Sequence, residues 1–141
     1  MPTEPDVISA MDSADEGLVI AAWSARERAY APYSEFRVGA ALKTKSGRVF
    51  VGCNIENLSF GLTMCAERVA VGAAVTAGES EFAAIVIVAE SAEPVTPCGA
   101  CRQVLAEFGN DLIVTSFNQT GLSYRATIKE LLPRSKAGIL G

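Results

Sequence analysis

The sequence contains no histidine among its 141 residues. Histidine is the side chain most often used as a general base or metal ligand near neutral pH. Any acid–base catalysis or metal binding by this chain must therefore use cysteine, aspartate, glutamate, lysine or tyrosine.

The sequence also lacks an excess of positive charge and long apolar runs. Its formal net charge is −4, so the composition gives no electrostatic signature for binding a phosphate backbone. No segment reaches the ~18 apolar residues of a membrane-spanning helix. The N-terminal stretch MPTEPDVISAMDSADE has neither basic residues nor an apolar core, unlike a secretory signal peptide. We therefore expect a cytoplasmic protein whose four cysteines serve metal binding or catalysis rather than disulfides.

The composition is that of a globular protein, with 50% hydrophobic and 20% charged residues. The length fits one domain of roughly 100–200 residues. The sequence shows no internal repeat and no Pro/Ser-rich linker. We expect a single domain over residues 1–141, with a loose N-terminal segment over residues 1–15.

Apolar periodicity and turn residues predict alternating helices and strands. Asp12, Ser13 and Asp15 are candidate N-caps for the first helix. The predicted helices cover residues 16–30, 65–77, 97–108 and 128–132, and the predicted strands cover residues 38–43, 48–53, 83–89, 112–117 and 124–127. This order predicts an α/β fold, a three-layer α-β-α sandwich with a mixed five-stranded sheet. A site is expected at the carboxyl ends of the strands.

Three cysteines stand where two predicted helices begin. Cys98 and Cys101 form a CxxC at one helix start, and Cys65 opens another helix. Helix N-termini favour the thiolate form that binds metals. Three protein ligands are typical of catalytic zinc, whereas a structural zinc site takes four. Cys53, the remaining cysteine, ends an apolar strand and fits a small core residue.

Glu67 follows Cys65 by two residues, which on a helix turns the two side chains in different directions. Glu67 is therefore a poor second ligand and a better candidate for carrying protons beside the metal. Two alternatives remain open at this point. A redox pair would explain Cys98 and Cys101 but leave Cys65 and Glu67 without a role, and a structural zinc site would need Cys53 as its fourth ligand.

The segments Cys65-Ala66-Glu67 and Pro97 to Gln103 together resemble the signature of zinc deaminases, which has a three-cysteine variant and a non-ligand glutamate. Three further segments are similar to homotetrameric cytidine deaminases, residues 31–42, 52–57 and 130–133. The resemblance implies one Zn²⁺ per chain, held by Cys65, Cys98 and Cys101. It also implies hydrolytic deamination of cytidine and 2′-deoxycytidine, with Glu67 as the catalytic residue, in a homotetramer whose sites are shared between subunits.

The resemblance assigns roles to five further residues. Asn54 and Glu56 would hydrogen-bond the ribose, Phe36 would pack against the pyrimidine ring, and the backbone N–H of Ala66 would donate to the base. Arg68 would contact the ligand thiolates and offset part of their negative charge. Without the resemblance, these residues would be interpreted as an ordinary polar loop, core or surface charges.

Two positions depart from the family pattern. Phe60 stands where many relatives have tyrosine, and Lys136 stands where the family often has a phenylalanine that reaches into a neighbouring subunit's site. The second departure keeps open a sister activity on another aminopyrimidine, such as blasticidin S. The acidic charge argues against a polynucleotide substrate.

Overall fold

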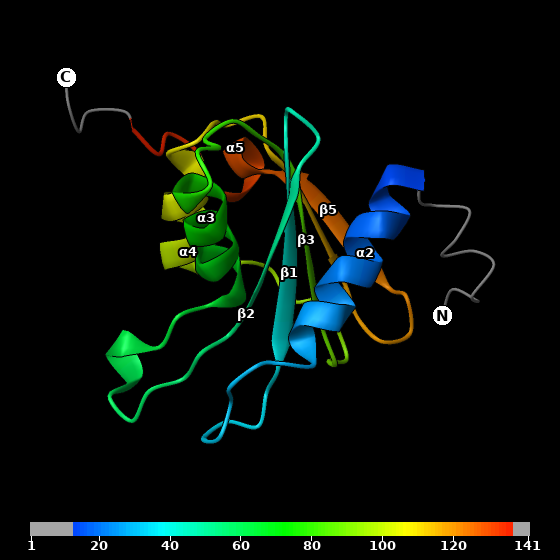
Figure 1. Cartoon of the computed structure of the whole chain (residues 1–141), viewed down its shortest axis with the longest axis vertical. Helices are drawn as coiled ribbons and strands as arrows, with labels where there is room; N and C mark the ends of the chain where they lie inside the picture. The colour runs from blue at the N-terminus through cyan, green and yellow to red at the C-terminus, as the bar shows by residue number, and fades with distance from the viewer. Residues whose placement is uncertain (1–12, 137–141) are drawn as a thin grey trace.

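A computed structural model describes residues 13–136, and Figure 1 shows that their sheet lies between two helical layers. The strand order is β2-β1-β3-β4-β5. The strands are β1 (Val38–Thr44), β2 (Val49–Cys53), β3 (Phe82–Ala89), β4 (Ile113–Phe117) and β5 (Ser123–Thr127). The helices are α2 (Ser13–Arg26), η1 (Phe60–Leu62), α3 (Ala66–Thr76), α4 (Gly99–Ala106) and α5 (Ile128–Leu131). The three-layer α-β-α sandwich with a mixed sheet is confirmed.

The sheet is mixed because one of its four strand pairs is parallel. β3 and β4 run parallel, with Ile85 opposite Val114, and α4 connects them. The pairs β1·β2, β1·β3 and β4·β5 are antiparallel. β3 is almost wholly buried, as expected for a strand covered on both faces.

Two apolar clusters hold the layers together. α2 packs on one face of the sheet through Leu18 and Ala22, against Val86 and Val88 of β3. On the other face, α3, α4 and α5 enclose a larger cluster that includes Leu42, Ile85, Ile87, Leu105 and Ile128. Figure 1 shows α2 on one side of the strands and α3 and α4 on the other.

Two glycines let helices approach the sheet closely. A Cβ on Gly52 of β2 would lie 2.3 Å from the carbonyl oxygen of Ala66 and 2.6 Å from the amide nitrogen of Ala70, both in α3. A Cβ on Gly39 of β1 would lie 2.0 Å from the carbonyl oxygen of Ala22 in α2. Gly52 therefore fixes how deeply the start of α3 sits on the sheet.

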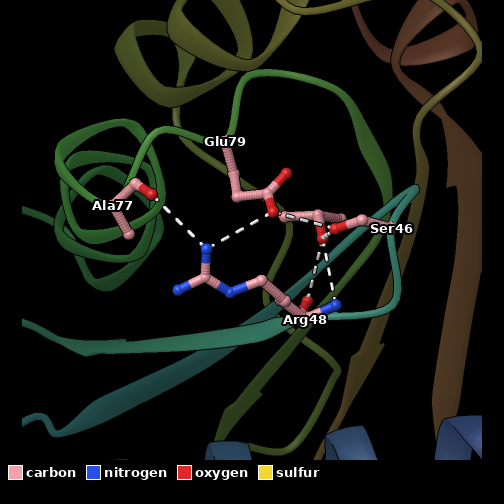
Figure 2. A network of polar contacts seen from close by, with 5 residues as sticks. Ser46, Arg48, Ala77 and Glu79 are labelled. Atoms are coloured by element: carbon pink, nitrogen blue, oxygen red, sulfur yellow. Dashed lines mark hydrogen bonds and ion pairs between the residues drawn. The ribbon is translucent and has the colours of Figure 1, made fainter.

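The β1–β2 turn is tied to the opposite end of α3 (Figure 2). Arg48 Nη1 donates to the carbonyl oxygen of Ala77 at 3.4 Å and contacts the Glu79 carboxylate at 3.4 Å. The Ser46 hydroxyl donates to the same carboxylate at 2.9 Å. α3 is thus held at its first turn by Gly52 and beyond its last turn by this polar network.

The predicted boundaries are wrong mainly at the first helix. α2 begins at Ser13 and ends at Arg26, whereas the prediction was 16–30. The helix ends early because Tyr30 pairs with the strand-like segment 54–56: its N–H donates to Asn54 at 3.0 Å and its carbonyl accepts from Glu56 at 2.8 Å. Asp12 and residues 1–12 of the predicted loose segment lie outside the described residues. Within the described part of the chain, no helix is both long and apolar enough to cross a membrane.

Candidate metal centre and active site

Cys65, Cys98 and Cys101 meet at one end of the sheet. Their three sulfur atoms lie within 4.8 Å of one another, and the Sγ atoms of Cys65 and Cys98 are 3.8 Å apart. Cys65 is the N-cap residue of α3 and Cys98 is the N-cap residue of α4, and neither side chain caps its own helix. The sulfurs are therefore free to face one another at two helix N-termini.

The three-cysteine group fits a zinc ion. Two sulfurs bound to one tetrahedral Zn²⁺ at ~2.3 Å lie about 3.8 Å apart, which agrees with the Cys65–Cys98 separation. Cys53 is not part of the group. The described residues therefore form a three-ligand site and not the closed four-cysteine site of the structural alternative.

The surroundings of Cys65 favour its thiolate. A hydrogen bond from Cys101, followed by contacts with Arg68 and Cys98, lowers the pKa of Cys65 from 9.0 to about 5. The pKa of Cys101 is raised, first because its thiol donates to Cys65 and then because it is buried. The pair therefore shares one proton and one negative charge near neutral pH, and a bound cation would displace that proton.

Arg68 supplies the positive charge next to Cys65. Its Nη2 lies 3.6 Å from Cys65 Sγ and donates to the carbonyl oxygen of Thr63 at 3.2 Å. The hydrogen bond to Cys65 raises the pKa of the guanidinium. Arg68 therefore lies against the Cys65 sulfur, and its role beside a bound metal stays a prediction.

Glu67 is buried at the first turn of α3, beside the sulfur group but outside it. Burial is the main cause of its raised pKa, and the charge of Cys65 raises that pKa further. A carboxylate with a raised pKa is a stronger base, as proton transfer near neutral pH requires.

A cavity of about 290 Å³ adjoins the cysteines. It is lined by seven of the nine site residues predicted from the sequence: Phe36, Asn54, Glu56, Cys65, Ala66, Glu67 and Cys98. Ala66 is the first residue of α3, where backbone N–H groups have no partner within the helix. Cys101 is fully buried, and neither it nor Arg68 lines the cavity wall.

Asn54 and Glu56 also hold the segment that forms one wall of the cavity. The Asn54 side chain donates to the carbonyl oxygen of Phe36 at 2.8 Å and accepts from the Val38 N–H at 2.9 Å. The Glu56 carboxylate accepts from the backbone N–H groups of Tyr33 (3.0 Å) and Ser34 (3.1 Å) and from the Ser34 hydroxyl. The hydrogen bond from that hydroxyl is the main cause of the lowered pKa of Glu56.

Phe60 and Lys136 are the two residues that differ from the family pattern, and neither of them lines this cavity. Phe60 is exposed in η1, and its ring packs edge-on against Tyr33 with centroids 6.0 Å apart. Lys136 lies against the end of α4, where its Nζ is 3.7 Å from the Glu107 carboxylate and 3.4 Å from the Glu107 carbonyl oxygen.

Sequence reasoning missed several residues of the cavity wall: Ser34, Val38, Thr63, Ile87, Val95 and Thr96. Ser34 lies in the segment 31–42 on which the resemblance rests, but no role was inferred for it. Thr96 stands two residues before Cys98. This proximity in sequence is the only signal that could have indicated its place in the cavity wall.

Comparison with known proteins agrees with this geometry. Residues 12–117 match the family model described as the cytidine and deoxycytidylate deaminase zinc-binding region. The chain is 48% identical over 119 residues to a cytidine deaminase of Sporosarcina psychrophila, covering 84% of the chain and 88% of the relative. A crystal structure of cytidine deaminase from Burkholderia pseudomallei is 51% identical, with a TM-score of 0.82, over 87% of this chain and 98% of that one. A blasticidin-S deaminase of Bacillus cereus is 34% identical over 108 residues, covering 71% of the chain and 76% of the relative.

Proposed function

The chain belongs to the cytidine and deoxycytidylate deaminase family, and we propose that it hydrolyses cytidine and 2′-deoxycytidine to uridine and 2′-deoxyuridine with release of ammonia. The observation that carries this proposal is a group of three cysteine sulfurs, two of them from residues that line one cavity together with the buried Glu67. The cavity volume of about 290 Å³ suits a small molecule. The redox alternative leaves Cys65 and Glu67 without a role.

Cys65, Cys98 and Cys101 would hold one Zn²⁺ per chain, with Arg68 offsetting the thiolate charge. Zinc, when bound, supplies the Lewis acidity that makes water a nucleophile at neutral pH. Glu67 takes a proton from the attacking water and delivers it to ring N3 of the pyrimidine. The same carboxylate then takes the proton of the new C4 hydroxyl and gives it to the amino group, which leaves as ammonia while the C4 carbonyl forms. A single acid–base residue thus serves both transfers, and no histidine is required.

The remaining wall residues would bind the nucleoside. Phe36 packs on the pyrimidine ring, the N–H of Ala66 donates to the base, and Asn54 and Glu56 face the ribose. Because these last two side chains already bond the backbone of segment 33–38, they would bind the sugar and shape the pocket together.

We also propose that the chain forms a homotetramer with shared sites, in the cytoplasm. The support is an apolar surface formed by Leu58, Phe60 and Leu62, residues that are 78%, 72% and 67% exposed. This surface lies on the segment between β2 and α3, next to Thr63 of the cavity wall. A reducing compartment would keep the three cysteines available for zinc.

The function is tested by mixing the purified protein with cytidine and following the cytidine absorbance band. We expect the band to decline, and we expect Glu67→Gln to keep one zinc per chain while turnover falls by a factor of at least ~10² to 10⁴. Cys98→Ala should lose the metal. Unchanged turnover by Glu67→Gln would refute the role of that carboxylate.

A panel of substrates distinguishes the sister activity. Rates on cytidine should far exceed rates on blasticidin S, because the more similar relatives are cytidine deaminases. Single-stranded DNA should not compete. A faster reaction with blasticidin S would reassign the substrate without changing the zinc site.

A further inference from the structure

The Arg102 guanidinium, on α4, donates to three acceptors: two backbone carbonyl oxygens and one side-chain hydroxyl. Its Nε donates to the carbonyl oxygen of Pro97 at 2.7 Å, and its Nη2 donates to the hydroxyl of Thr96 at 3.1 Å. Its Nη1 donates to the carbonyl oxygen of Leu131, in α5, at 3.0 Å. One guanidinium therefore ties the segment that enters α4 to the end of another helix.

The segment held in this way delivers the zinc ligand Cys98. Pro97 is the residue directly before Cys98, and the backbone N–H of Arg102 donates to the carbonyl oxygen of Cys98 at 2.9 Å. Arg102 thus donates to the carbonyl oxygens of both Pro97 and Cys98, to the first with its side chain and to the second with its backbone N–H. The Cys98 side chain makes no capping hydrogen bond that would fix the residue. The contacts with Arg102 therefore hold the Cys98 backbone in the position from which its sulfur faces Cys65.

α5 gives this contact a firm support although it has only four residues. A capping box joins Thr127 and Glu130 at its start, and Ile128 is completely buried. The N–H groups of Ile128 and Lys129 donate to Leu112 and Asn110, at 3.0 and 3.1 Å. The carbonyl oxygen that Arg102 binds is therefore anchored to the loop that leads into β4.

We propose that Arg102 is a positioning residue for the metal centre, holding Cys98 in place by bridging the Thr96 hydroxyl and the Pro97 carbonyl oxygen to α5. The inference rests on the proposed zinc site and extends it to a residue outside the ligand group. It also gives a physical reason for two sequence features with no other role in the mechanism, the arginine that follows Cys101 and the Glu130–Pro133 segment. The bridge needs a planar fork, because its three acceptors lie in different directions from one side chain.

Arg102→Lys is the decisive variant, because it keeps the charge and removes the fork. We expect the zinc-loaded variant to release its metal to excess chromogenic chelator 10–100-fold faster than the wild type, the range typical of residues that support metal ligands. Thr96→Val, which removes only the Nη2 acceptor, should accelerate release by a smaller factor. After cobalt substitution, the thiolate-to-metal absorption of Arg102→Lys should also shift.

Arg48→Lys is the matched control. Arg48 also donates to a backbone carbonyl, but at the far end of α3 (Figure 2). We expect Arg48→Lys to release zinc at the wild-type rate, even where it lowers the melting temperature of the zinc-free protein as much as Arg102→Lys does.

The outcomes separate the inference from the proposed function. A wild-type protein that binds no zinc refutes the function and the inference together. A wild-type protein with one zinc per chain refutes the inference alone if Arg102→Lys releases metal no faster than an equally destabilised Arg48→Lys. If Arg102→Lys does not fold, the Thr96→Val variant provides the test. Zinc release from Thr96→Val at the wild-type rate would then refute the inference.

Discussion

Asn54 shows at the scale of a single residue how a binding side chain can also build its own pocket. Its amide nitrogen donates to the Phe36 carbonyl oxygen, and its amide oxygen accepts from the Val38 N–H. The residue is only 8% exposed. Asn54→Ala would leave a carbonyl and an N–H without partners, at about 1–3 kcal/mol for each group that stays buried.

We therefore expect Asn54→Ala to lower the melting temperature by several degrees and to raise KM for cytidine, since Phe36 loses its support. Thermal denaturation and steady-state kinetics measure the two effects. Asn57→Ala is the control, because Asn57 is exposed and caps only the Ser59 N–H. Equal melting temperatures and equal KM values for both variants would show that Asn54 does not organise the pocket.

At the scale of elements, α3 owes its depth on the sheet to Gly52. A Cβ there would collide with the backbone of α3 at Ala66 and Ala70, and backbone cannot give way as a flexible side chain can. We expect Gly52→Ala to destabilise the protein by about 1–3 kcal/mol, as overpacking typically does, and to lower zinc affinity by displacing Cys65.

Gly17→Ala is also a glycine-to-alanine substitution, but we expect it to stabilise the protein, whereas Gly52→Ala should destabilise it. Gly17 lies within α2, and a Cβ there meets nothing within 4 Å. Alanine should stabilise that helix by about 0.5–1 kcal/mol. Chemical denaturation of both variants would check the pair, and a destabilising Gly17→Ala or a neutral Gly52→Ala would contradict this account of the packing.

The capping box of α5 makes a pH-dependent contribution. Hydrogen bonds from the backbone and then the side chain of Thr127 lower the pKa of Glu130 below its ordinary 4.5. A carboxylate with a lowered folded-state pKa stabilises the fold above its unfolded pKa, and this contribution disappears as the pH falls through the folded value. Glu130→Gln keeps the box without the charge, so its melting temperature should lie below that of the wild type at neutral pH and converge with it in acid.

Melting of the zinc-free proteins between about pH 7 and pH 3 tests this convergence. A difference in melting temperature that stays constant over the range would mean that the Glu130 charge does not contribute.

The elements also show which features could be predicted from sequence. Buried strands such as β3 and small-residue helices such as α3 follow from local apolar patterns, and Cys65, Glu67, Cys98 and Cys101 follow from spacing and resemblance. The early end of α2 could not be predicted, because it depends on Tyr30 pairing with residues 54–56. Arg102 was equally out of reach, since its acceptor at Leu131 is 29 residues away and becomes adjacent only in the fold.

At the scale of the whole molecule, the exposed surface of Leu58, Phe60 and Leu62 predicts self-association. We expect the wild type to sediment at four times the 14.8 kDa mass of the chain, and we expect Leu58→Asp to shift it to smaller species with reduced activity. Ile20→Asp is the control, because Ile20 is similarly exposed, at 70%, but lies on α2 in the opposite layer.

A fully active wild-type monomer would exclude shared sites. In residues 13–136 one sheet joins the five described strands, and the single domain over residues 1–141 stays a prediction.

The distance along the chain between Cys65 and Cys98 has a consequence for biosynthesis. The two residues are 33 positions apart, so at roughly 5–20 residues per second the ribosome makes Cys98 about 2–7 seconds after Cys65. During that interval β3 is synthesised, while neither Cys98 nor Cys101 is yet available to Cys65. Metal loading in the cell must therefore follow synthesis of β3 and of the start of α4, and nascent chains stalled before α4 should take up no zinc at this site.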